Sequence, residues 1–135
     1  TCLIYICLYN YQIKISLLLI FLGLLIIFSS YAIDKFKNVF KEIDAKEIVI
    51  DEFIGQSVPI LTIYNIIEKN NFNHFILYTF LSFILFRIFD IWKPYPINKI
   101  DNEMKNGFGV ILDDLVAGVF SAIILLTFIF FINYG

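Results

Sequence analysis

The stretch ISLLLIFLGLLIIFSSYAI, residues 15–33, runs without a single charged side chain. A helix needs about 20 apolar residues to cross the hydrocarbon core of a bilayer, and this stretch supplies them. The whole chain of 135 residues is similar in kind, with 60% hydrophobic and 16% charged residues, whereas soluble domains carry about 25% charged residues. The sequence therefore predicts an all-α, integral membrane helical bundle that forms a single membrane domain over residues 1–135.

Further apolar segments lie on either side of this stretch. The segment from Thr1 to about Tyr9 is too short to cross a bilayer. Since apolar sequence begins at once, we expect this segment to be the tail of a truncated N-terminal helix. The other segments run over about residues 45–67, 75–92 and 108–134, and Pro94 ends the second of these because proline cannot continue a helix. We expect about four spanning helices plus the truncated one.

Lysines gather in the connections on one side of the predicted bundle. Residues 34–47 and 93–107 are separated by two spans, so they lie on the same side of the membrane. These two connections contain Lys35, Lys37, Lys41, Lys46, Lys93, Lys99 and Lys105. The opposite connections contain only Lys14 and Lys69. Because cytoplasmic connections carry an excess of Lys and Arg, the lysine-rich side is predicted to be cytoplasmic.

Three charged clusters fall within the predicted spans, all near the lysine-rich side. They are Asp51 with Glu52, Arg87 with Asp90, and Asp113 with Asp114. Charges inside membrane segments are energetically expensive, and they usually mark a functional site. The three clusters are therefore predicted to meet just inside the cytoplasmic interface.

Two simpler explanations account for only part of this pattern. Carboxylates at a helix N-terminus can complement the helix dipole, but that benefit fades after the first turn. If the third helix begins at Asp44, Asp51 lies roughly 10 Å further along it. A salt bridge between Arg87 and Asp90, three residues apart, explains that pair but not the other carboxylates. Adjacent residues point about 100° apart on a helix, so which member of each carboxylate pair faces the site stays open.

The residue types favour a particular chemistry. Oxygen ligands without a nearby His or Cys are typical of Mg²⁺, which takes one or two carboxylates together with water or phosphate. Arg87 and Lys93 could hold phosphate oxygens. Metal-assisted hydrolysis of a phosphate ester therefore fits the cluster, and its position at the interface fits a phospholipid substrate.

Other functions fit the sequence less well. A net charge of −2 implies no basic surface for nucleic acid. A phosphohistidine route is disfavoured because His74, the only histidine, falls on the opposite side. Cys2 and Cys7 do not form a thiolate phosphatase motif. Intramembrane carboxylates also occur in cation carriers, or as polar contacts in a non-catalytic membrane subunit. A carrier needs polar groups across the whole bilayer, and the other halves of these segments are almost purely apolar.

Three motifs in order along the chain resemble those of the bacterial phosphatidylglycerophosphatase A family. They are IVIDEFIGQ at residues 48–56, FRIFDIWKPYPI at 86–97, and GFGVILDD at 107–114 followed by Ala117 and Gly118. The resemblance implies a Mg²⁺-dependent enzyme of the bacterial inner membrane with its active site facing the cytoplasm. It would hydrolyse the terminal phosphate of phosphatidylglycerol phosphate, giving phosphatidylglycerol and inorganic phosphate in glycerophospholipid biosynthesis.

The resemblance also implies roles for the motif residues. The implied catalytic residues are Asp90, Asp113 and Asp114, and the implied phosphate ligands are Arg87 and Lys93. The implied metal ligands are Asp51, Glu52, Asp90, Asp113 and Asp114. The family's glycine- and threonine-containing motif before its first helix has no counterpart here, which we interpret as an N-terminal truncation.

Overall fold

Six helices make up the secondary structure of the computed structural model, which describes residues 1–36, 49–67, 72–104 and 106–134. They are α1 (Cys2–Asn10), α2 (Ile15–Phe36), α3 (Ile50–Ile66), α4 (Phe72–Trp92), α5 (Ile97–Glu103) and α6 (Gly107–Tyr134). These described ranges contain no strand. The prediction of an all-α fold is confirmed.

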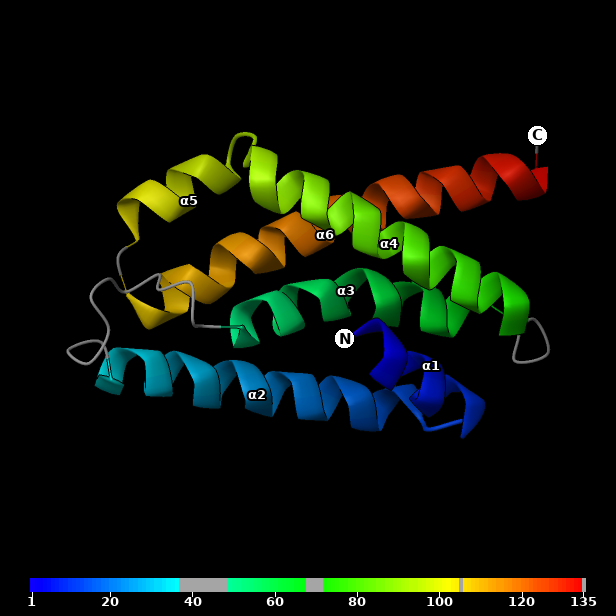
Figure 1. Cartoon of the computed structure of the whole chain (residues 1–135), viewed down its shortest axis with the longest axis horizontal. Helices are drawn as coiled ribbons and strands as arrows, with labels where there is room; N and C mark the ends of the chain where they lie inside the picture. Colours follow the sequence, from blue (N-terminus) through cyan, green and yellow to red (C-terminus); the bar gives the residue numbers. More distant parts are fainter. Residues whose placement is uncertain (37–48, 68–71, 105, 135) are drawn as a thin grey trace.

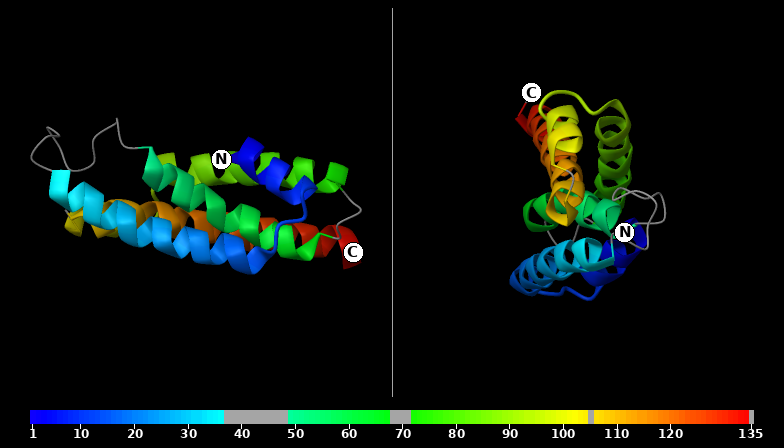
Figure 2. Two further views of the ribbon diagram at one scale, coloured as in Figure 1. Left: turned by 90° about the horizontal axis from the view of Figure 1, so that it is seen from below. Right: turned by 90° about the vertical axis from the view of Figure 1, so that its left-hand side faces the viewer.

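The four longest helices lie side by side along one axis (Figure 1). Helices α3 and α6 run in one direction, and α2 and α4 run in the other. Helix α3 occupies the centre and contacts α2, α4 and α6, as the end-on view in Figure 2 also shows. The short helix α1 packs on α3 and α4, whereas α5 lies at the end of the bundle where α3 and α6 begin.

Three helices of the described part of the chain are long and apolar enough to cross a membrane. They cover Ile15–Lys35, Phe72–Trp92 and Gly107–Ile132. Their outer faces expose large apolar side chains, among them Phe28, Phe80 and Phe131, as lipid-facing helices do. Helix α3 has 17 residues, or about 25 Å of length, and most of it is buried by its neighbours. The predicted membrane bundle is confirmed, with α3 as a shorter, central fourth helix.

Helix boundaries agree with the sequence signals at some points and differ at others. Helix α4 ends at Trp92, as the following proline predicts, and Lys93 adopts a left-handed backbone conformation with φ of 43°. Residues 37–48, which include the predicted start of the third segment near residue 45, lie outside the described residues. Helix α3 begins at Ile50 with Val49 as its N-cap, so Asp51 and Glu52 lie in its first turn and not roughly 10 Å along it, and the helix dipole also stabilises them. Helix α5 was not predicted, because its seven residues lie in a polar connection without an apolar repeat.

Two glycines bring the backbones of α3 and α6 into direct contact. A Cβ atom added at Gly55 would lie 2.6 Å from the backbone oxygen of Asp114. A Cβ atom added at Gly118 would overlap the backbone oxygen of Gly55. Small residues permit such close approach between membrane helices. This contact fixes how the charged residues nearby are placed.

Candidate active site

The glycine contact determines which carboxylates meet. Asp51 precedes Gly55 by four residues on α3, and Asp114 precedes Gly118 by four residues on α6. Residues four apart lie on the same face of a helix. The helices α3 and α6 run in the same direction (Figure 1). Asp51 and Asp114 therefore each lie one turn before the glycine contact on their own helix.

Four aspartates gather at this point from three helices. Asp114 lies within electrostatic range of Asp51, Asp90 and Asp113, and its carboxyl group is within hydrogen-bonding range of that of Asp90. Asp51, Asp113 and Asp114 are only 7%, 5% and 5% exposed. Carboxylates this close repel one another unless a proton or a cation lies between them. We call these four residues the acidic cluster.

Arg87 on α4 forms one edge of the acidic cluster. Its guanidinium donates two parallel hydrogen bonds to Glu52, Nη1 to Oε1 at 2.9 Å and Nη2 to Oε2 at 3.0 Å. Nη1 also donates to Asp90 Oδ2 at 2.9 Å. Bidentate pairs of this kind fix the plane of the guanidinium. Arg87 therefore joins α3 to the acidic cluster, and the salt bridge with Asp90 expected from their spacing is present as well.

Lys93, directly after α4, forms the opposite edge. Its Nζ atom is 2.8 Å from Asp113 Oδ2 on α6 and 2.9 Å from Asp101 Oδ1 on α5. Burial by itself would lower the pKa of this ammonium, but the hydrogen bonds and charges of Asp113 and Asp101 outweigh burial, so its pKa lies above the ordinary value. Lys93 is thus protonated at neutral pH.

The two edges share one arrangement. In each, a cation lies between an outer carboxylate and an inner carboxylate of the acidic cluster. The outer carboxylates, Glu52 and Asp101, have side chains that are 39% and 29% exposed, whereas the inner ones, Asp90 and Asp113, are at 18% and 7%. The cations therefore lie at the mouth of the cluster, between its buried carboxylates and solvent.

All seven residues predicted for the site come together at this end of the bundle, where α3 and α6 begin and α4 ends. Glu52 was predicted as a metal ligand. In the structure it is paired with Arg87, and both of its carboxylate oxygens accept hydrogen bonds from the guanidinium. Asp101 was missed, because a lone aspartate in a polar connection gives no signal in the sequence. His74 lies at the start of α4, at the far end of that helix.

Within the described residues, no three His, Cys, Asp or Glu side chains converge as a ready-made metal site. Lys93 and Arg87 hold Asp113 and Asp90 by ion pairs in this arrangement. The four aspartates therefore lie near one another without forming a metal site in this arrangement, and two of them are paired to cations.

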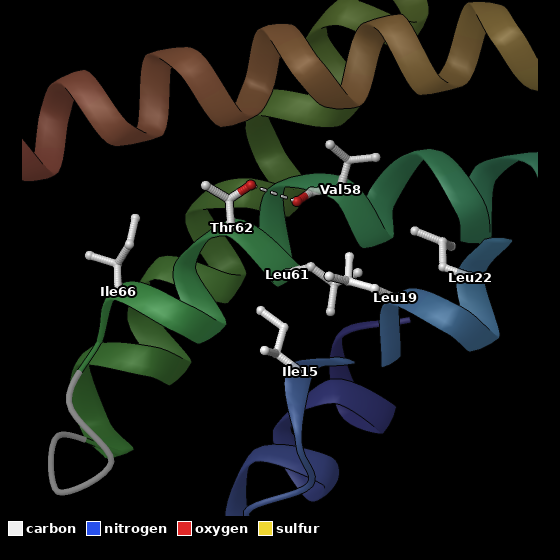
Figure 3. A pocket seen from close by; sticks show the side chains of 7 residues that line it. All are labelled: Ile15, Leu19, Leu22, Val58, Leu61, Thr62 and Ile66. Atoms are coloured by element: carbon white, nitrogen blue, oxygen red, sulfur yellow. Dashed lines mark hydrogen bonds between the residues drawn. The ribbon is translucent and has the colours of Figure 1, made fainter. Parts of the chain in front are cut away.

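A separate apolar pocket of about 390 Å³ lies between α2 and α3 (Figure 3). It is lined by Ile15, Leu19, Leu22, Val58, Leu61, Thr62 and Ile66. The Thr62 hydroxyl donates to the backbone oxygen of Val58 within α3, as the dashed line shows. None of these side chains is ionisable, so the pocket offers no catalytic group.

Comparison with known proteins identifies the family. Residues 1–129 match the family described as phosphatidylglycerophosphatase A. A phosphatidylglycerophosphatase A of Escherichia coli K12 is 39% identical over 82 residues, which are 61% of this chain and 43% of the relative. One of Haemophilus influenzae Rd is 31% identical over 110 residues, 82% of this chain and 63% of the relative.

A third relative carries a different name. A protein of Bacteroides thetaiotaomicron, provisionally named as a phosphatidylinositol-3-phosphatase, is 37% identical over 95 residues, 70% of this chain and 55% of the relative. The chain spans about half the length of the curated relatives it matches. No solved structure matches it. With a family match over nearly its whole length, the chain belongs to the phosphatidylglycerophosphatase A family.

Proposed function

We propose that this chain hydrolyses the terminal phosphate of phosphatidylglycerol phosphate, giving phosphatidylglycerol and inorganic phosphate. The observation that carries the proposal is the acidic cluster with one cation on each side, Arg87 and Lys93. Carboxylates serve proton transfer and metal binding, and the flanking cations suit a phosphate dianion. The family membership supports the same reaction.

Magnesium is the cofactor we propose, because the acidic cluster supplies carboxylate oxygens, the ligand type that Mg²⁺ prefers. Asp90 and Asp114 approach each other closely, with Asp51 and Asp113 beside them, and Mg²⁺ needs only one or two carboxylates with water and phosphate. Two or more of these four aspartates would hold the ion, which would polarise a phosphoryl oxygen. Glu52 was also predicted as a metal ligand, but its pairing with Arg87 favours a role in orienting that side chain.

The chain's own residues supply the remaining chemistry. Arg87 and Lys93 would bind phosphate oxygens and neutralise charge as the ester bond to glycerol breaks. A carboxylate among Asp90, Asp113 and Asp114 would take the proton of the attacking water. The water oxygen would form a new bond to phosphorus, and the electron pair of the broken P–O bond would go to the glycerol oxygen, which takes up a proton.

We further propose that the chain lies in the bacterial inner membrane with the acidic cluster facing the cytoplasm. Lys35, Lys93 and Lys99 lie at the charged end of the bundle, in agreement with the excess of basic residues on the cytoplasmic side. A phospholipid headgroup at that interface reaches the cluster while its acyl chains stay in the bilayer.

A cation carrier is the second candidate, and one observation bears on it. Gln56, Thr79 and Ser82 are buried one to two turns deeper than the charged residues, and the Gln56 Oε1 and Thr79 Oγ1 atoms have no hydrogen-bond partner among the described residues. Beyond them, Tyr9 stacks on Phe75 with ring centroids 3.9 Å apart, and the hydroxyls of Tyr9 and Tyr64 donate to backbone oxygens. Among the described residues the buried carboxylates all lie at the charged end and none at this depth, so hydrolysis is favoured.

The test is phosphate release by the purified chain in detergent, with phosphatidylglycerol phosphate or phosphatidylinositol 3-phosphate as substrate. We expect release from the first, dependent on Mg²⁺ and abolished by a chelator. Asp90→Asn and Asp113→Asn should each abolish release without unfolding the protein. Unchanged turnover in both variants would refute the proposed site. Cation flux into proteoliposomes without lipid phosphate would instead support a carrier.

A further inference from the structure

Asp101 lies outside the three motifs, yet the structure places it at the acidic cluster. It is carried by α5, which packs firmly at both ends. Ile97 at the start of α5 is fully buried with Phe86 and Ala117. After its end, Met104 contacts Gly109 so closely that a Cβ atom there would overlap the backbone oxygen of Met104. The backbone that carries Asp101 is therefore held against α6, and Ile97 also packs on Phe86 of α4.

Lys93, the partner of Asp101, needs such a tether. A lysine side chain has four flexible carbons and a compact ammonium that loses much entropy when held in one place. Its backbone has a φ of 43°, a left-handed conformation that a residue other than glycine adopts at a cost. With Asp101 on one side and Asp113 on the other, the ammonium is fixed between α5 and α6.

We propose that Asp101 is a positioning residue, which holds the Lys93 ammonium at the mouth of the acidic cluster for the phosphate of the substrate. This inference rests on the proposed function. Without Asp101, Lys93 would pair with the buried carboxylate of Asp113 alone, and the incoming phosphate would have to draw it away. With Asp101 in place, Lys93 keeps one carboxylate contact while it turns to the phosphate.

The Arg87 edge of the cluster supports this assignment. Glu52 holds the guanidinium of Arg87 from outside while Arg87 also contacts Asp90. Asp101 stands in the same relation to Lys93 and Asp113. In both edges a carboxylate that is more exposed than the inner one orients the cation without belonging to the acidic cluster.

The test compares substrate affinity with turnover. In Asp101→Asn, KM and the Kd for a non-hydrolysable phosphonate analogue of phosphatidylglycerol phosphate should both rise about fivefold to tenfold, as expected for losing one charged hydrogen bond at a partly exposed site. The kcat value should change less than about twofold. Glu103→Gln is the matched control, since it removes an exposed carboxylate from the same helix and should leave both values unchanged.

Repeating the Asp101→Asn substitution in a variant that lacks Lys93 distinguishes a positioning role from a purely structural one. In Lys93→Met, adding Asp101→Asn should cause no further rise in the Kd of the analogue, because the residue to be positioned is gone. An equal rise in both backgrounds would show that Asp101 merely supports α5, and would overturn the proposal. Asp101→Glu keeps the charge and should recover most of the affinity, and no recovery in a folded variant would also overturn it.

Failure of this inference can be told apart from failure of the proposed function. If the unsubstituted chain neither binds the analogue nor releases phosphate, the proposed function is wrong, and this inference falls with it. If the unsubstituted chain binds and turns over, but Asp101→Asn matches it in KM and Kd, only the positioning role is wrong.

Discussion

The two ends of the bundle use the same helices for different purposes. At one end α3, α4 and α6 bring four aspartates, Arg87 and Lys93 together. Toward the other end, α1, α3 and α4 pack the aromatic rings of Tyr9, Tyr64 and Phe75, with edge and stacked contacts between them. One end concentrates charge and the other fills space.

The aromatic end contributes mainly to the stability of the fold, whereas the charged end carries the groups proposed for catalysis. Aromatic contacts in a membrane protein stabilise by close packing, since lipid is as apolar as the rings. Buried carboxylates instead bring a desolvation penalty and mutual repulsion, which the flanking cations offset only in part. We therefore expect substitutions at the aromatic end to change unfolding, and substitutions at the charged end to change catalysis.

The largest effect should come from the glycine contact on which the charged end depends. In Gly118→Val, the side chain would meet the backbone oxygen of Gly55, which cannot move without shifting α3. We expect a loss of more than about 3 kcal/mol in the free energy of unfolding and a loss of phosphate release. Chemical denaturation in detergent measures the first. Gly23→Ala is the control, because its Cβ would meet nothing within 4 Å. Normal stability of Gly118→Val would mean that this helix contact is not needed.

A smaller effect, confined to stability, is expected at the aromatic end. Phe75 is fully buried, so Phe75→Ala should leave a cavity and lower the free energy of unfolding by about 3 kcal/mol. The KM and kcat of the folded fraction should not change, because no residue of the acidic cluster contacts this ring. A change in KM with unaltered stability would show that the two ends are coupled.

The smallest effect should appear at the charged end, in catalysis alone. Arg87→Lys keeps the charge but loses the two parallel hydrogen bonds to Glu52. We expect kcat/KM to fall about tenfold to a hundredfold while the unfolding midpoint shifts little. Steady-state kinetics with the lipid substrate give the first quantity. If the Arg87→Lys variant retains full activity, the two parallel hydrogen bonds of the guanidinium are not needed for catalysis.

Much of the fold could be predicted because its signals are local. The end of α4 follows from Pro94, and the long apolar runs give α2, α4 and α6. Alternating helix directions place the three charged clusters at one end, as predicted. These inferences needed only hydropathy and helix geometry.

What could not be predicted depends on rotation and packing between helices. The pair Asp51 and Glu52 points in two directions, with Asp51 in the acidic cluster and Glu52 on Arg87. Which of the two residues faces the acidic cluster depends on how α3 is rotated against α4 and α6. Asp101 could not be predicted for a related reason. A short polar helix has no periodic apolar face, and Ile97 is the one buried side chain of α5.

The central claim is that the four aspartates form a hydrolytic site, and Asp114 tests it most directly. Asp114 interacts with each of the other three and is nearly fully buried. Asp114→Asn keeps the shape of the side chain and replaces one carboxyl oxygen that could bind a metal ion or take up a proton. The measurement is Mg²⁺-dependent phosphate release from phosphatidylglycerol phosphate, with thermal unfolding recorded on the same sample. We predict at least about a thousandfold loss of release, with an unfolding temperature that changes little because asparagine keeps the shape of the side chain. Release at the rate of the unsubstituted chain would contradict the account.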